Sequence, residues 1–80
     1  MSGYELYHEI SGDTNVRVRR EVVARGLKDR IAFRNIFWDE DREAFVLLGG
    51  TRTPALWDGE RLHEGEEAVM RALRDMIPDS

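Results

Sequence analysis

The chain has 80 residues, 16 of them acidic and 12 basic, for a net charge of −4 at pH 7, and it contains no cysteine. These numbers exclude thiol–disulfide exchange by its own residues, a disulfide and a cysteine metal site, and they make a nucleic-acid partner the least favoured. We expect one small domain spanning 1–80. No apolar run approaches the roughly 18 residues of a membrane span, and no secretory signal is visible, so we expect a cytoplasmic protein without membrane contact.

The first half begins with a strand. Alternating apolar and polar side chains predict it at Tyr4–His8. Residues 11–15 are of the types that cap helices, and a helix is predicted over Val16–Arg25. Gly26 is expected to end this helix, and Ile31–Phe37 alternates as a second strand.

A second helix is predicted from its acidic start. Asp39–Asp41 complements the positive end of a helix dipole, and Gly49-Gly50 ends the pattern. We expect its apolar stripe to consist of Ala44, Leu47 and Leu48.

The last third predicts a hairpin and a helix. Strands are expected at Pro54–Trp57 and Glu60–His63, joined by a tight Asp58-Gly59 turn. Pro78 is expected to end the last helix. That helix has apolar residues at helical spacing, namely Ala68, Val69, Ala72, Leu73, Met76 and Ile77.

The order of elements, βαβαββα, predicts an α/β fold. The first two strands should be parallel with a right-handed crossover, and the hairpin should add an antiparallel pair. We therefore expect a four-stranded mixed sheet with helices on both faces, which buries both sides of the sheet.

Four short motifs follow one another along the chain. They are Tyr4-Glu5-Leu6-Tyr7; Val18-Arg19-Arg20 with Arg25-Gly26-Leu27; Leu47-Leu48-Gly49-Gly50 with Thr53-Pro54-Ala55-Leu56 and Asp58-Gly59; and Leu62-His63-Glu64-Gly65-Glu66-Glu67-Ala68-Val69. In this order they resemble the glutaredoxins and the N-terminal domains of glutathione transferases over nearly the whole chain. The resemblance implies a thioredoxin-like fold of the glutaredoxin type.

The resemblance also locates the missing cysteines. Counting back from Val18, the family's C-P-Y-C motif falls on Gly12-Asp13-Thr14-Asn15, so Gly12 and Asn15 replace both cysteines. Arg52-Thr53-Pro54 stands where glutaredoxins have Thr-Val-Pro, and Gly65 stands where transferases have serine. The expected function is therefore a redox-inactive binding module.

Three segments form the expected ligand site. The helix start Gly12-Asp13-Thr14-Asn15 resembles the family's anion-holding corner, although Asp13 or Thr14 could be an ordinary N-cap. The resemblance implies a cis peptide before Pro54, which would present the Thr53 backbone to glutathione or an extended peptide; the alternative is a trans proline that begins a strand. Glu64, Gly65 and Glu66 resemble the patch that holds the γ-glutamyl end of glutathione, or the acids simply complement a helix dipole.

The alternative function is enzymatic. A glutathione-dependent transferase- or reductase-like activity would use the hydroxyl of Ser11 or Thr14, but no adjacent base is apparent in the sequence. No cofactor is expected beyond glutathione as a ligand.

Three other features have a plain structural interpretation. His8 and His63 are expected to be unrelated, not a metal pair completed by a carboxylate. Residues 14–38 carry seven cations against two acids, a surplus of five that we expect on a solvated face, with an anion-binding patch as the alternative. Trp38 and Trp57 are expected in or near the core, or one of them as an exposed anchor for a partner.

Overall fold

The computed structural model describes residues 3–76 as a four-stranded mixed sheet with helices on both faces. The order βαβαββα is confirmed, with a short 3₁₀ helix added at Lys28–Arg30. The elements are β1 (Tyr4–His8), α1 (Asp13–Ala24), β2 (Ile31–Asn35), α2 (Asp39–Leu47), β3 (Ala55–Trp57), β4 (Leu62–Glu64) and α3 (Glu66–Asp75).

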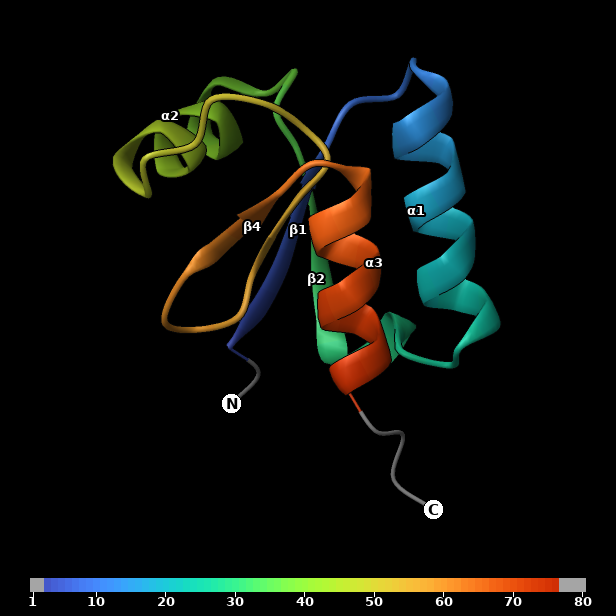
Figure 1. The fold of residues 1–80 in the computed structure, drawn as a ribbon. Coiled ribbons are helices and arrows are strands. Elements are labelled where there is room, and N and C mark those ends of the chain that lie inside the picture. The colour runs from blue at the N-terminus through green and yellow to red at the C-terminus, as the bar shows by residue number, and fades with distance from the viewer. Residues whose placement is uncertain (1–2, 77–80) are drawn as a thin grey trace.

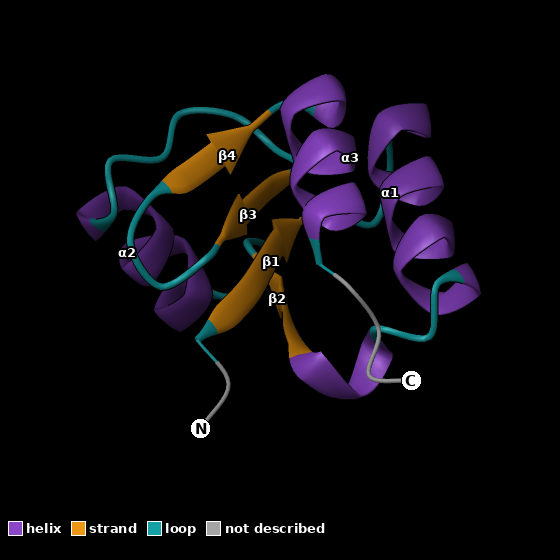
Figure 2. Ribbon diagram, turned by 60° about the horizontal axis from the view of Figure 1, so that its bottom comes forward, coloured by secondary structure: helices purple, strands orange, loops and turns teal. Residues whose placement is uncertain are grey.

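The strands lie in the order β2-β1-β3-β4. β1 pairs parallel with β2, and β3 pairs antiparallel with both β1 and β4. Helices α1 and α3 lie side by side on one face of the sheet, and α2 covers the other (Figures 1 and 2). Because β1 and β2 are parallel, the loops that follow them leave the sheet at the same end, shown at the top of Figure 1.

Each face of the sheet has its own core. Under α1 and α3, Leu6 and Leu56 pack against apolar residues of both helices. Under α2, Tyr7 and Ala55 pack with Phe45, and the Tyr7 and Phe45 ring centroids are 5.2 Å apart. Leu6 and Tyr7 face opposite sides, so the predicted alternation of β1 is confirmed.

A polar network ties α2 to the sheet. The Tyr7 hydroxyl donates to Glu5 at 2.6 Å, and Arg34 donates to both Glu5 and Asp41 at 3.0 Å. Burial, and next the bond to Glu5, raises the pKa of the Tyr7 hydroxyl well above its ordinary value.

The predicted stripe of α2 was partly wrong. Leu47 is 86% exposed, whereas Phe45 is only 4% exposed. Two helical residues two positions apart point about 200° from each other, so burying Phe45 turns Leu47 outward. The inward stripe consists of Ala44, Phe45 and Leu48.

Several predicted boundaries also differ. α1 begins at Asp13, three residues before the predicted start, and β2 ends at Asn35. Asn35 ends the strand because its side-chain oxygen accepts the Phe37 N–H at 2.9 Å and forms a turn. The predicted helix end at Ile77 and Pro78 lies outside the described residues.

The hairpin has a four-residue loop in place of the predicted tight turn. Trp57 pairs with Leu62, which leaves residues 58–61 in the loop. The Asp58 carboxylate accepts the backbone N–H groups of Glu60 and Arg61, both at 2.8 Å, and so closes a wider turn than two residues would. As a consequence β3 and β4 are each three residues long.

Candidate functional site

The start of α1 is the corner where the family resemblance places the lost cysteines. Gly12 is the N-cap, with φ 102° and ψ 126°, and no side chain caps the helix. Asp13 and Thr14 lie inside the first turn, so the interpretation of either as N-cap was wrong. The Asp13 carboxylate is exposed in this turn, where it complements the helix dipole.

Asn15 stabilises the loop between β1 and α1. Its side chain is only 5% exposed, and its Oδ1 accepts the Glu9 N–H at 3.0 Å. The Glu9 carboxylate in turn accepts the Thr53 hydroxyl at 2.6 Å. Asn15 therefore holds the loop from within, and Glu9 joins it to the segment before Pro54.

The Thr53–Pro54 peptide is cis, as the resemblance implied. Pro54 is fully buried, and its carbonyl accepts the Gly65 N–H at 2.8 Å. Gly65 is the N-cap of α3, with φ 93° and ψ 155°. The proline segment thus lies between the β1–α1 loop and the start of α3.

The two acids next to Gly65 already bind groups of their own chain. Glu64 ends β4, and its Oε1 accepts the N–H groups of Thr51 and Arg52 at 2.8 and 3.0 Å. These bonds, that of Thr51 first, lower the pKa of the Glu64 carboxyl. Since Glu64 precedes α3 and bonds to the 51–52 loop, the interpretation that it only complements the α3 dipole was wrong.

Glu66 joins α3 to α1. Its carboxylate receives two bonds from the Arg17 guanidinium, at 2.5 and 3.0 Å, and this pairing lowers the pKa of the Glu66 carboxyl. The Arg52 guanidinium lies against Gly65, since a Cβ added there would be 3.1 Å from Nη2. The three predicted segments are therefore joined, Pro54 to Gly65 directly and the others through Glu9 and Arg17, which lie outside them.

The candidate hydroxyls have no visible activating group. In the stretch that the structure describes, neither Ser11 nor Thr14 hydrogen-bonds through its side chain to an imidazole or a carboxylate. Ser11 is exposed beside the corner, and Thr14 is half-buried in the first turn of α1. No specific observation favours the enzymatic alternative, which stays an untested prediction.

The two histidines have separate partners. His8 is 7% exposed beside Arg19, and burial, with Arg19 second, lowers the pKa of its imidazole. His63, in β4, lies opposite Leu56 of β3, and its Nε2 bonds to the Asp58 carboxylate at 2.8 Å. Within residues 3–76 no group of three His, Asp or Glu side chains is placed to hold a metal ion.

The arginines of α1 are largely committed to the fold. Arg17 pairs with Glu66, and Arg19 donates to the Glu9 and Ile10 carbonyls at 2.5 and 3.1 Å. Arg20 is exposed. A patch for anions therefore retains fewer free cations than the sequence indicated. Among the described helices, none has the length and apolar character needed to cross a membrane.

Three exposed apolar side chains beside the corner were missed by most of the sequence reasoning. Ile10, Phe37 and Trp38 are 61–73% exposed, although Trp38 was expected in or near the core. Trp57 is half-buried, as expected. The available signal was the adjacent Phe37-Trp38 pair, which breaks the alternating pattern of β2, because neighbouring residues of a strand face opposite sides.

Comparison with known proteins adds no family to this geometry. The chain matches no protein-family model, no curated protein and no solved structure.

Proposed function

We propose that the chain is a thioredoxin-like domain of the glutaredoxin type that binds an extended ligand and carries out no redox chemistry of its own. The observation that carries this proposal is the position of the Thr53–Pro54 segment, held between Glu9 on one side and Gly65 on the other. In the proposed complex the Thr53 backbone pairs with an extended chain, in the manner of strand addition.

The strand order and the helix arrangement support the same proposal. The sheet order β2-β1-β3-β4, with α1 and α3 on one face and α2 on the other, suits a thioredoxin-like domain of minimal length. The resemblance aligns the reactive corner with the start of α1, where Gly12 and Asn15 stand at the places of the cysteines. A corner of this kind without a thiolate can bind a ligand but cannot exchange disulfides.

The charges favour a peptide over glutathione as the ligand. Glutathione brings two carboxylates and one ammonium group, whereas Glu9, Asp13, Glu64 and Glu66 already surround the corner. Glu64 and Glu66 also occupy donors that a ligand carboxylate would need. An uncharged extended backbone avoids both conflicts, because strand addition uses only main-chain groups.

Amide chemical-shift titration of the ¹⁵N-labelled chain tests the proposal. One probe is an uncharged, blocked pentapeptide of alternating valine and threonine, and the other is reduced glutathione. We expect the pentapeptide to shift the amides of Gly12–Asn15, Thr53 and Glu64–Glu66. Flat titrations with both probes would exclude the proposed function, and a flat titration with glutathione alone would leave the peptide version.

A matched pair of variants tests the charge argument. Glu66→Gln weakens the hold on Arg17 and should tighten glutathione binding about threefold, the order of one exposed ion pair. Glu67→Gln changes the net charge equally on the next residue of α3, which is exposed, and should leave the affinity unchanged. Equal effects of the two substitutions would mean that overall charge, and not the Arg17 pair, governs access.

A further inference from the structure

Five large apolar side chains are exposed on the α2 side of the molecule, with exposed fractions from 61% for Trp38 to 86% for Leu47. This group, called the apolar surface below, consists of Ile10, Phe37, Trp38, Val46 and Leu47. Single exposed apolar residues are ordinary, but a group of five large ones on a small domain marks an interaction site. It lies outside the residues of the proposed ligand corner.

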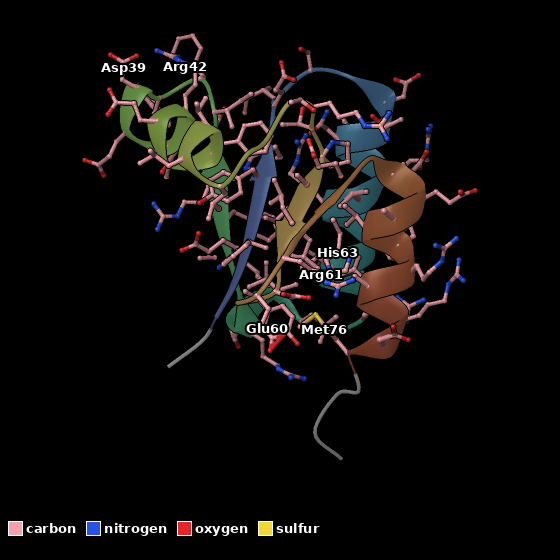
Figure 3. All side chains as sticks on the ribbon, turned by 60° about the vertical axis from the view of Figure 1, so that its left-hand side comes forward. Asp39, Arg42, Glu60, Arg61, His63 and Met76 are labelled. Carbon is pink, nitrogen blue, oxygen red and sulfur yellow. The ribbon has the colours of Figure 1, made fainter. Side chains whose placement is uncertain are left out.

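Residues of the apolar surface line two hollows. A groove of about 560 Å³ is lined by residues 9–11 and 35–38, and a second hollow of about 370 Å³ is lined by Arg42, Glu43, Val46 and Leu47. Arg42 links the two, because its Nη1 donates to the Ile36 and Phe37 carbonyls at 3.4 Å. Figure 3 shows Arg42 beside Asp39 at the outer end of α2.

Contacts between neighbouring residues hold Phe37 and Trp38 in place. The Phe37 and Trp38 rings pack edge to face with centroids 5.2 Å apart. Trp38 is the N-cap of α2, and its carbonyl accepts the Arg42 N–H at 2.9 Å. A tryptophan held on a rigid turn loses little conformational freedom on binding, which favours it as an anchor.

The rim of the apolar surface is acidic. Arg34 pairs with Asp41 and Arg42 pairs with Asp39, so these four charges balance. Three carboxylates remain without a cationic partner among the described residues, those of Glu9, Glu40 and Glu43. The Arg19 guanidinium, which donates to the Glu9 and Ile10 carbonyls, offsets one of these three charges. About two negative units therefore remain beside the grooves, and they attract a positively charged partner.

We propose that the apolar surface is the docking site for a partner protein segment that carries apolar side chains flanked by lysine or arginine. The grooves take the apolar side chains, and the rim carboxylates select for basic flanks. The same rim disfavours an anionic membrane, since lipid headgroups would face Glu9, Glu40 and Glu43. Apart from Glu9, which also bonds to Thr53, the residues of this docking site lie outside the ligand corner.

Two synthetic peptides of 14 residues test this proposal. One contains leucine and lysine in an amphipathic helical pattern, and the other replaces every lysine with glutamate. We expect the leucine/lysine peptide to shift the amides of Ile10, Phe37, Trp38, Val46 and Leu47 and to leave Glu64 and Gly65 unmoved. The leucine/glutamate peptide should not bind.

Four variants locate the binding energy. Trp38→Ala should weaken the leucine/lysine peptide about 30-fold, as expected for an aromatic anchor worth about 2 kcal/mol. Leu47→Ser, at the most exposed of the five positions, should weaken it without affecting the fold. The double reversal Glu40→Lys with Glu43→Lys should weaken binding about tenfold at low salt and less at high salt.

The fourth variant is the matched control for charge. Glu60→Lys with Asp75→Lys changes net charge by the same amount at exposed positions away from the apolar surface. Figure 3 shows Glu60 at the opposite end of the structure from Asp39 and Arg42. This variant should bind the leucine/lysine peptide as the native chain does.

Three outcomes would overturn the proposal. The first is no binding of the leucine/lysine peptide, and the second is equal weakening by the two double reversals. The third is a concentration-dependent dimer in sedimentation that Trp38→Ala abolishes, which would assign the apolar surface to a second copy of the chain. Loss of the pentapeptide titration at Thr53, by contrast, would affect only the proposed function of the ligand corner.

Discussion

Introducing a cysteine at position 12 tests the backbone conformation at the start of α1. Gly12 has φ 102° and ψ 126°, a conformation that L side chains rarely adopt. A non-glycine residue in so sparsely populated a region costs of order 1–3 kcal/mol. The added Cβ would lie 3.4 Å from the Asn15 Nδ2, an ordinary contact that adds little. Gly12→Cys should therefore lower the free energy of unfolding by about 1–3 kcal/mol.

Urea denaturation measures this loss, and Ser11→Cys is the matched control. Ser11 is exposed and has an ordinary backbone, since no described non-glycine residue has positive φ. A cysteine there should change the free energy of unfolding by less than about 0.5 kcal/mol. Equal stability of the two cysteine variants would refute the argument from backbone conformation. The pH dependence of alkylation should also show a lower thiol pKa at position 12, at the helix N-terminus, than at position 11.

Three further predictions concern stability. Leu56→Ala removes a fully buried side chain and should cost about 2–5 kcal/mol in urea denaturation, whereas Leu47→Ala, 86% exposed, should cost less than about 0.5 kcal/mol. Arg34→Met leaves two bridged carboxylates unpaired and should cost about 1–2 kcal/mol, less in high salt, with an unchanged result at high salt counting against the network. The bond to His63, followed by those of the hairpin loop, lowers the pKa of Asp58 to about 2. The stability that the ionised Asp58 contributes to the fold is therefore present above about pH 4 and lost as pH falls toward 2. Asp58→Asn should remove this loss from an acid titration of the circular-dichroism signal.

The order of elements was predictable because each element carries a local pattern. Alternation in β1 and helical spacing in α3 are statements about neighbouring residues, and both are confirmed. The choice between Phe45 and Leu47 on α2 was not predictable in the same way. Both residues fit a stripe that includes Ala44 and Leu48, and only contact with Tyr7 decides which of them turns inward.

In the candidate site, too, local sequence patterns predicted less than tertiary contacts decide. The cis peptide at Pro54 followed from the family resemblance, not from any local pattern. The Arg17–Glu66 pair joins residues 49 positions apart, and no periodicity relates them. The bond from Glu64 to the 51–52 loop likewise depends on how β4 lies against that loop. Such pairings come from tertiary contact, so sequence reasoning could name the residues but not their partners.

At the two positions that the resemblance assigns to cysteine, Gly12 and Asn15 stabilise the backbone at the start of α1. Gly12 allows a backbone turn that a side chain would strain, and Asn15 supplies a buried amide oxygen to the Glu9 N–H. A thiol at position 15 would be a weaker acceptor and would leave that N–H poorly satisfied. Neither residue can therefore be regarded as a neutral replacement. Since Glu64 and Glu66 also bind donors within the chain, an incoming ligand must displace these acids or use other groups, and main-chain pairing at Thr53 meets the second condition.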